Sequence, residues 1–225
     1  MFDFTPFFEN SGEILRGFWA TLRLAGAAAV LSLVIGTVMV SFRVAPVPVM
    51  RKFGTGYVNI VRNTPLTLVL LMCSLGLNDI LALKFSSVSS TTYYWWAVVG
   101  LSAYTGAFVC ETLRSGINTS PLGQAEAARS IGLTFTQNLR YVVLPQAWKA
   151  AIVPLGSVLV AMAKNSALAG FFGLVGDLTN TMNVLVSQEG EPLIPVMIGI
   201  SAWYLLMTIP ASLVLDTVER RRRLA

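Results

Sequence analysis

Five long stretches without clusters of charge constrain the fold of this chain more than any other feature of its sequence. They cover residues 24–42, 65–83, 86–110, 150–176 and 192–215. Only Asp79 and Lys164 interrupt them. Roughly 20 predominantly apolar residues are enough for a helix to cross the hydrocarbon core of a bilayer, and a chain with 55% hydrophobic and 12% charged residues is not typical of a soluble domain. The sequence therefore predicts an all-α polytopic membrane protein with five transmembrane helices.

Basic residues mark one side of the predicted membrane. The connections after the first and third stretches, and the tail after the fifth, contain Arg43, Arg51, Lys52, Arg114, Arg129, Arg140, Lys149 and the arginines at 220–223. The other side is mainly acidic, with Asp3, Glu9, Glu13, Asp79, Asp177, Glu189 and Glu191. Because Lys and Arg concentrate in cytoplasmic loops, we expect an external N-terminus and a cytoplasmic C-terminus, which requires an odd number of spans.

The residue types present exclude several kinds of chemistry. The chain has no histidine, which removes His-based acid–base catalysis and the commonest zinc ligand sets. Cys73 and Cys110 lie in apolar stretches, where a thiol is a small hydrophobe. The arginine tail is expected to contact anionic lipid and not nucleic acid, because no aromatic residues alternate with it. We therefore expect a chain that is not an enzyme and that binds no metal or cofactor itself.

One long polar connection, at residues 115–148, contains residues typical of the beginnings and ends of helices and does not have the composition of a linker. Ser120 followed by Pro121 is typical of a helix N-terminus, and the pair precedes a candidate helix at 122–131. Gly132 can end that helix. The first half of the connection is therefore predicted to be helical.

A second candidate helix follows the glycine. Thr134 stands three residues before Gln137, which is capping-box spacing, ahead of the run at 138–144. Pro145 is expected to end or kink that run. The connection is thus predicted to be a helix, a glycine break and a second helix.

The first of these two helices carries small side chains. Ala127 and Ala128, exposed beside Glu126, would let a partner's groove approach closely, and the carboxylate would meet a basic residue there. An amphipathic connector lying on the membrane explains the same composition. The composition is compatible with both interpretations, a docking helix and a connector on the membrane.

The spacing of these residues resembles a known signature. Glu126-Ala127-Ala128, three residues, Gly132, nine residues and then the sequence VVLP at 142–145 is similar to the EAA motif of ABC importer permeases, E-A-A-x3-G-x9-I-x-L-P. Valine replaces isoleucine at position 142. Four separated elements keep this spacing in a connection that the charge distribution independently assigns to the cytoplasm.

Further segments resemble the permeases of polar amino acid importers, the histidine, glutamine and glutamate type. Gly17, Thr21 and Leu22 are similar to G-x3-T-L, RNTPL at 62–66 to R-x-T-P-L, AFVCETLRSGI at 107–117 to A-Y-x-A-E-x-x-R-G-G-I, and KNSAL at 164–168 to K-[DN]-[ST]-S-L. Phe108, Cys110, Ser115 and Ala167 depart from these patterns. Within the group, the chain resembles actinobacterial glutamate permeases.

This resemblance implies a single permease domain over residues 1–225, with the type I ABC importer permease fold, in the bacterial cell membrane. It implies as partners a pair of ATP-binding subunits, which bind ATP and Mg²⁺, a second permease subunit, the same or different, and an extracellular solute-binding protein. The chain has no G-x4-G-K-[ST] phosphate loop of its own. The loop at 115–148 would couple the ATPase to the membrane helices through Gln124, Glu126, Ala127, Ala128 and Gly132.

Lys164 is the first candidate for substrate binding. A charge at the centre of a span costs roughly 2.5 to 3.5 kcal/mol on insertion scales. Lys164 either extends to the outer surface, or pairs structurally, or holds a substrate carboxylate. Members of the resembled family have Asp or Asn at the position of Asn165, and Asn leaves the lysine without an adjacent anion, which favours an acidic or neutral amino acid. Ser166, Thr64 and Thr67 are candidates for neutral hydrogen bonds, and Arg62 ranks below Lys164.

Two other polar features of the spans have simpler explanations. Glu111 stands three residues before Arg114 on a predicted helix, so we expect a local ion pair at the cytoplasmic edge. The aromatic cluster at 93–96 is typical of an interfacial belt.

The sequence therefore predicts a permease subunit of an ATP-driven importer for glutamate or a related acidic or polar amino acid. The alternative is an ATP-independent secondary amino acid transporter or channel, which would also explain the spans and the buried lysine but not the EAA spacing.

Overall fold

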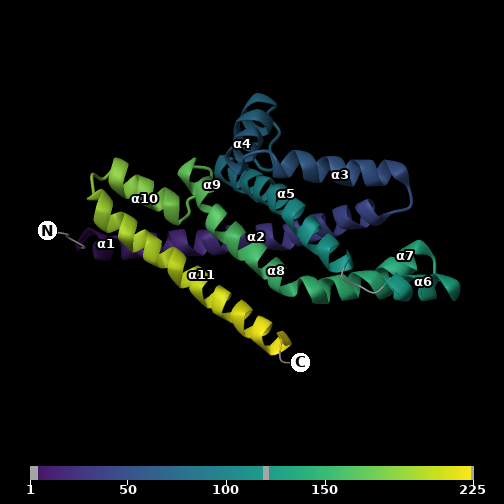
Figure 1. Ribbon diagram of the computed structural model, residues 1–225. Coiled ribbons are helices and arrows are strands. Elements are labelled where there is room, and N and C mark those ends of the chain that lie inside the picture. The colour runs from purple at the N-terminus through teal and green to yellow at the C-terminus, as the bar shows by residue number, and fades with distance from the viewer. Residues whose placement is uncertain (1–4, 119–121, 224–225) are drawn as a thin grey trace. The chain divides into compact units, whose positions relative to one another are not determined.

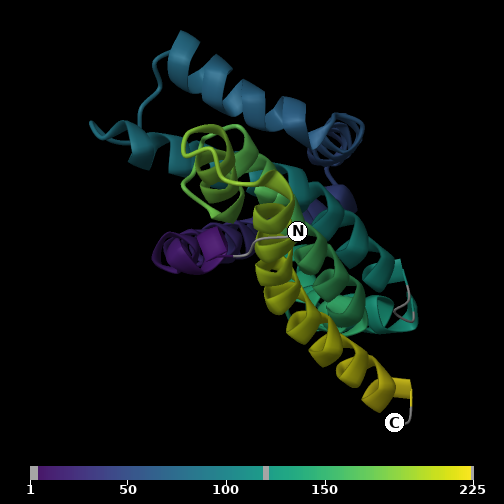
Figure 2. The same cartoon turned by 90° about the vertical axis from the view of Figure 1, so that its left-hand side faces the viewer.

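The computed structural model describes residues 5–118 and 122–223, and every regular element in these ranges is helical (Figure 1 and Figure 2). The helices are α1 (Thr5–Glu9), α2 (Ser11–Val44), α3 (Pro48–Arg62), α4 (Leu66–Leu71), η1 (Met72–Ile80), α5 (Ser89–Asn118), α6 (Leu122–Ser130), α7 (Phe135–Asn138), η2 (Leu139–Val143), α8 (Leu144–Asn165), α9 (Ala167–Phe171), α10 (Leu178–Ser187) and α11 (Leu193–Arg223). The predicted all-α fold class is confirmed.

Within residues 5–118 and 122–223, four helical segments are long and apolar enough to cross a membrane. They are Ser11–Val44, Ser89–Asn118, Phe135–Phe171 and Leu193–Arg220, and they overlap the first, third, fourth and fifth predicted stretches. A fifth crossing exists only if two helices bent by 105°, Pro48–Arg62 and Leu66–Ile80, count as one span. The second predicted span is therefore half of a broken helix pair.

Helix α3 was not predicted, because its polar face interrupts the apolar pattern. Pro48 begins it after extended backbone at Val47, as suits the first turn of a helix. Gly54 and Val58 are buried, whereas the basic residues near its start are exposed. The helix ends at Arg62, and Pro65 disfavours helical backbone just before it. The RNTPL segment is therefore the bend of the helix pair.

The described residues form two compact units, each with its own core. The first consists of residues 5–30, 65–101 and 160–214, and the second of 31–64, 102–118, 122–159 and 215–223. Ile14, Leu178, Leu185, Val196 and Ile200 form a buried cluster in the first unit. Val40, Val58, Ala107, Val109, Cys110, Leu113, Ala151 and Leu155 form one in the second. The prediction that Cys110 is a small hydrophobe fits its place in this core.

A buried carboxyl group, that of Asp177, forms hydrogen bonds with α10 and α11 in the first unit. Asp177 is 0% exposed and begins α10, where its Oδ1 accepts the N–H of Asn180 at 2.9 Å. The hydroxyl of Tyr204 lies 3.5 Å from the other carboxyl oxygen, and the next N–H, of Leu178, donates to Thr21 Oγ1 at 3.1 Å. Burial raises the pKa of Asp177 to about 7, although the hydrogen bonds from Asn180 and Tyr204 to its carboxyl group oppose the shift.

Asp177→Asn is expected to remove a pH dependence of stability. Because the pKa of Asp177 in the folded state lies above its ordinary value of 3.8, its contribution to stability is full below that value and is lost as pH rises to about 7. This loss is on the order of 4 kcal/mol for a shift of this size. Unfolding of the detergent-solubilised protein between pH 4 and 8 measures it, with Asp216→Asn, an exposed position on α11, as control. An identical pH profile in parent and Asp177→Asn proteins would contradict the assignment.

Candidate coupling loop and cleft

The connection between α5 and α8 has the predicted order of helix, glycine break and helix. Gly132 has a φ of +90°, a left-handed conformation that L-residues rarely adopt. The N–H of Gly132 donates to the Arg129 carbonyl at 2.9 Å and the N–H of Leu133 to the Ala128 carbonyl at 3.1 Å, which is the Schellman pattern that ends a helix. Gly132 therefore fixes the end of α6.

The start of α7 also follows the prediction. Thr134 Oγ1 accepts the N–H of Gln137 at 3.3 Å, and the Gln137 side chain accepts the N–H of Thr134 at 2.9 Å, so both halves of the capping box are present. The predicted N-cap at Ser120 and Pro121 falls outside the described residues. Pro145 does not end the second helix. The five residues of η2 are π-helical, and the helix continues through Pro145 as α8.

The exposed surface of α6 differs in one residue from the expectation. Glu126 and Ala127 are exposed, as is Gln124, but Ala128 is buried with only 6% of its surface accessible. Because α6 packs on α7 and η2, one of its sides must face inward, and a residue adjacent to Ala127 lies about 100° away from it around the helix. The predicted exposure of Ala128 was therefore wrong.

Two side-chain contacts hold the loop together and join it to α8. Asn138 Nδ2 donates to the Ala125 carbonyl of α6 at 3.0 Å. Gln146 Nε2 donates to Gln124 Oε1 at 2.6 Å, so a residue of the predicted coupling set contacts the first turns of α8 directly. Asn138 and Gln146 were not predicted, because their partners lie more than ten residues away in the sequence.

The helices that flank the loop approach each other closely at a glycine. A Cβ placed on Gly116 would lie 2.6 Å from the carbonyl oxygen of Ala147. Backbone atoms cannot move aside as a flexible side chain can, so a larger residue at 116 would separate α5 from α8. The Gln124–Gln146 bond ties the loop to α8, and Gly116 brings the end of α5 against the start of α8.

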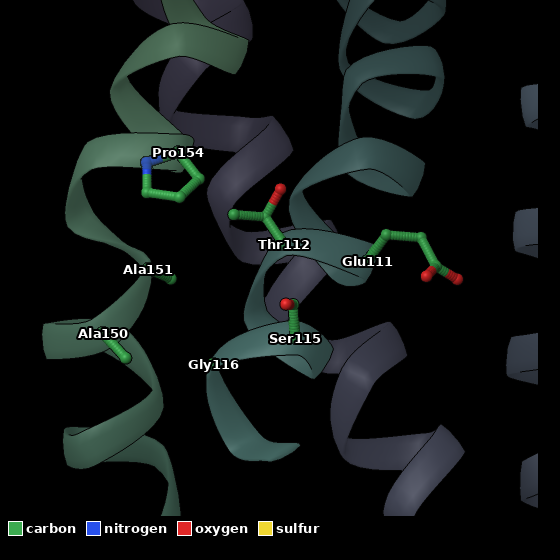
Figure 3. Close-up of a pocket in the computed structure, with 7 residues that line it drawn as sticks. All are labelled: Glu111, Thr112, Ser115, Gly116, Ala150, Ala151 and Pro154. Atoms are coloured by element: carbon green, nitrogen blue, oxygen red, sulfur yellow. The ribbon is translucent and has the colours of Figure 1, made fainter. Parts of the chain in front are cut away.

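A cleft of about 480 Å³ opens beside this contact. Its lining consists of Glu111, Thr112, Ser115, Gly116, Ala150, Ala151 and Pro154. Figure 3 shows the alanines and the proline of α8 facing α5, whereas the carboxylate of Glu111 points away from α8. Pro154 has no N–H, so the carbonyl of Ala150 lacks its usual helical donor. The lining therefore offers hydroxyl and carbonyl groups and no basic side chain.

Glu111 forms its ion pairs with residues of other helices. Its carboxylate contacts Arg43 of α2 and lies 3.9 Å from Arg62, the last residue of α3. The Arg62 guanidinium also lies over the Phe108 ring, 5.4 Å from its centroid. The predicted ion pair with Arg114 was wrong, because the Glu111 carboxylate contacts Arg43 and Arg62 while Arg114 is exposed. A local pair three residues apart on a helix would stabilise it by only about 0.2 to 0.5 kcal/mol.

Glu111→Ala is expected to destabilise the second unit by about 1 to 3 kcal/mol. The Arg43 side chain is only 6% exposed, so removing the carboxylate leaves a nearly buried cation without its partner. Arg114→Ala should change the free energy of unfolding by about 0.5 kcal/mol or less. Denaturant unfolding in detergent compares the two variants. If Arg114→Ala lowered the free energy of unfolding more than Glu111→Ala, the local Glu111–Arg114 pair would be supported and the Arg43 pair contradicted.

The predicted substrate residues lie at two breaks in the helices. Lys164, Asn165 and Ser166 are consecutive where α8 gives way to α9, in the first unit. Lys164 is exposed and forms no ion pair with the described residues. Ser166 is buried, and its hydroxyl donates to the Ala163 carbonyl at 2.8 Å. Thr67 lies half-buried on α4 in the same unit.

Arg62 and Thr64 belong to the second unit, at the bend after α3. Thr64 uses its hydroxyl to donate to the Ile60 carbonyl at 2.8 Å, and Arg62 already contacts Glu111 and Phe108. Among the residues that the structure describes, no three His, Cys, Asp or Glu side chains gather as metal ligands. The candidate substrate residues thus form two groups, and Ser166, Thr64 and Arg62 already make internal contacts.

Comparison with known sequences gives matches over nearly the whole chain. Residues 28–224 match the family described as the inner membrane component of binding-protein-dependent transport systems. The glutamate transport system permease protein GluC of Corynebacterium efficiens is 42% identical over 214 residues, 93% of each chain. The glutamate/aspartate import permease protein GltJ of Escherichia coli K12 is 30% identical over 219 residues, 95% of this chain and 88% of the relative.

Solved structures share the fold. A crystal structure of an amino acid ABC transporter with histidines contains a chain that is 28% identical, with a TM-score of 0.83 and coverage of 98% of this chain and 99% of that one. An inward-facing structure of the MetNI methionine ABC transporter matches with a TM-score of 0.73 at 21% identity, over 92% of this chain and 95% of the other.

Proposed function

Because this chain belongs to the family of inner membrane components of binding-protein-dependent transport systems, we propose that it is the permease subunit of an ATP-driven importer of glutamate or a related acidic or polar amino acid. Family membership confirms the resemblance to ABC importer permeases and the membrane location. The observation that carries the choice of glutamate is 42% identity to a glutamate transport permease over 93% of both chains.

The coupling role is assigned to the loop that contains α6. The exposed side chains of Gln124, Glu126 and Ala127 would contact the ATP-binding subunits, which bind ATP and Mg²⁺ and hydrolyse the nucleotide. Ala128 would act from inside the loop by packing α6 on α7. Small exposed residues permit close docking, and the carboxylate would meet a basic group of the partner.

Two close contacts would transmit a movement of α6 to the membrane helices. The Gln124–Gln146 hydrogen bond joins α6 to α8, and Gly116 brings α5 against the start of α8. Gly132 holds the end of α6 in one conformation, so a push on its surface would be transmitted and not absorbed by the loop. Closure of the ATPase pair would thus shift α5 and α8 together.

Substrate binding is assigned first to Lys164. The ammonium of Lys164 lies within a span and forms no ion pair with any residue in the described ranges, which suits it to a carboxylate. Asn165 adds no opposing negative charge. Ser166, Thr64 and Thr67 would contribute hydrogen bonds as the pathway changes shape. Arg62 takes a secondary part, because Glu111 and Phe108 already hold its guanidinium.

The working complex would contain a second permease subunit, identical or not, and an extracellular solute-binding protein. The basic residues of the loop and of the C-terminal tail would lie in the cytoplasm and the N-terminus outside. An ATP-independent transporter or channel is the second candidate. It would explain Lys164 but gives the exposed α6 surface no role.

A panel of amino acids tests the substrate assignment. The chain is purified with its ATPase, second permease and binding protein and placed in proteoliposomes, and the hydrolysis rate is measured with glutamate, aspartate, glutamine and arginine. We expect glutamate to stimulate hydrolysis at the lowest concentration and arginine not to stimulate it. Stimulation by arginine alone would overturn the assignment of an acidic substrate.

A further inference from the structure

Arg23 of α2 faces an open cavity in the first unit, remote in sequence from the residues assigned to substrate and ATPase. The cavity has a volume of about 360 Å³ and is lined by Ala20, Arg23, Ser90, Thr91 and Tyr94. Arg23 Nε donates to the Trp19 carbonyl at 3.3 Å, which fixes the start of the guanidinium group. No carboxylate among the described residues pairs with Arg23.

The polar side chains that line this cavity can all donate hydrogen bonds. A guanidinium carries five N–H donors and no acceptor, and Arg23 uses one of them within the described part of the chain. Ser90, Thr91 and Tyr94 contribute hydroxyls, and none of the lining residues that the structure describes is acidic. A cation surrounded by hydroxyl donors is suited to an anion with several oxygen atoms, such as a phosphate group.

The surrounding residues place the cavity at the edge of the bilayer. Arg23 comes immediately before the uncharged stretch at 24–42, and Tyr94 lies in the first turns of the α5 span. Trp19 and Trp95 beside them are 56% and 43% exposed. Tryptophan, tyrosine and arginine at the ends of apolar spans lie at the level of lipid headgroups. The phosphates of the membrane lipids are therefore the anions at this depth.

We propose that the cavity of Arg23, Ser90, Thr91 and Tyr94 binds the phosphodiester of an anionic phospholipid. The guanidinium would bind two phosphate oxygens through parallel N–H groups, and the hydroxyls of Ser90 and Thr91 would donate to the others. A zwitterionic headgroup would bring an ammonium group to a cavity whose described lining residues offer no carboxylate to receive it. The lining thus favours a lipid such as phosphatidylglycerol over phosphatidylcholine.

Native mass spectrometry of the detergent-purified full chain, titrated with phosphatidylglycerol or phosphatidylcholine, tests this proposal. Arg23→Gln should weaken phosphatidylglycerol binding about tenfold and remove the preference for phosphatidylglycerol over phosphatidylcholine. Arg16→Gln is the matched control, because Arg16 lies on the same helix and makes the same kind of bond, from Nε to the Gly12 carbonyl at 3.3 Å. It lines no part of the cavity and lies 4.0 Å from Glu13.

A second variant tests the hydroxyls without altering charge. Ser90→Ala combined with Thr91→Val should weaken phosphatidylglycerol binding about threefold while Arg23 remains. Equal losses for Arg23→Gln and Arg16→Gln would overturn the proposal, since they would reflect net charge alone. Equal affinity of the parent protein for the two lipids would also overturn it. Displacement of the lipid by millimolar inorganic phosphate would identify a free anion as the ligand and contradict a lipid site.

Discussion

ATP-driven uptake is expected to fall about tenfold or more when Gly132 is replaced with proline, with membrane insertion unchanged. Gly132 has a φ of +90°, whereas the proline ring holds φ near −65°. Proline also removes the N–H that donates to the Arg129 carbonyl. The end of α6 would then lose its fixed conformation, and movement of the ATPase would no longer reach α8 through Gln124.

Two other glycine variants separate backbone conformation from bulk. Gly132→Ala should give an intermediate loss, because left-handed backbone costs an L-residue about 1 to 2 kcal/mol. Gly123→Ala should be normal, since no atom lies within 4 Å of the added carbon and no left-handed conformation is required there. Uptake, ATP hydrolysis and the amount of inserted protein are measured in the same proteoliposomes. Uptake at the parent level by Gly132→Pro would contradict the role of the loop.

Glu126→Lys tests the surface of the same loop without altering its backbone. The Glu126 side chain is exposed, so the loop should keep its fold while its charge is reversed. We expect substrate to stop stimulating ATP hydrolysis. A fully stimulated complex would show that the carboxylate does not face the ATPase.

Lys164→Gln is expected to raise the substrate concentration needed for half-maximal uptake about tenfold or more, with expression unchanged. A hydrogen bond to a charged group contributes about 1.5 to 3 kcal/mol, and each 1.4 kcal/mol corresponds to a factor of ten. Glutamine keeps the polarity and most of the length of the side chain but removes the ammonium. Because Lys164 has no acidic partner among the residues described, the change should not leave a buried charge unpaired.

Two companion variants make this result specific. Lys84→Gln, an exposed lysine outside the candidate spans, should transport as the parent does. Asn165→Asp adds a carboxylate beside Lys164 and should weaken uptake of an anionic substrate while sparing a neutral one. The half-maximal concentrations for glutamate and glutamine measure this difference. A Lys164→Gln protein with parental values for both would remove the lysine from the binding site.

Local features of the sequence predicted the loop well, because their physics is local. The capping box of Thr134 and Gln137 and the break at Gly132 depend only on residues within a few positions, and both are present in the structure. Long apolar runs likewise located four spans, since burial in lipid depends on composition over about 20 residues. Helix α3 was missed because its basic residues interrupt the apolar run, although its amphipathic spacing was readable.

Contacts between distant residues could not be predicted in this way. Glu111 has a basic residue three positions away, but its partners are Arg43 and Arg62, which only the packing of α2, α3 and α5 brings near. Burial of Ala128 likewise depends on where α7 packs. For Asp177 the sequence predicts only an external acidic residue, because its burial arises from segments far apart in the chain.

The most direct test of ATP-driven glutamate import is the initial rate of labelled glutamate uptake into proteoliposomes that contain the full complex. The rate is measured with ATP inside the vesicles, with a non-hydrolysable analogue inside, and with an imposed proton or sodium gradient but no nucleotide. We predict accumulation against a concentration gradient only with hydrolysable ATP. Equal uptake driven by an ion gradient alone would contradict ATP-driven import and identify an ATP-independent transporter.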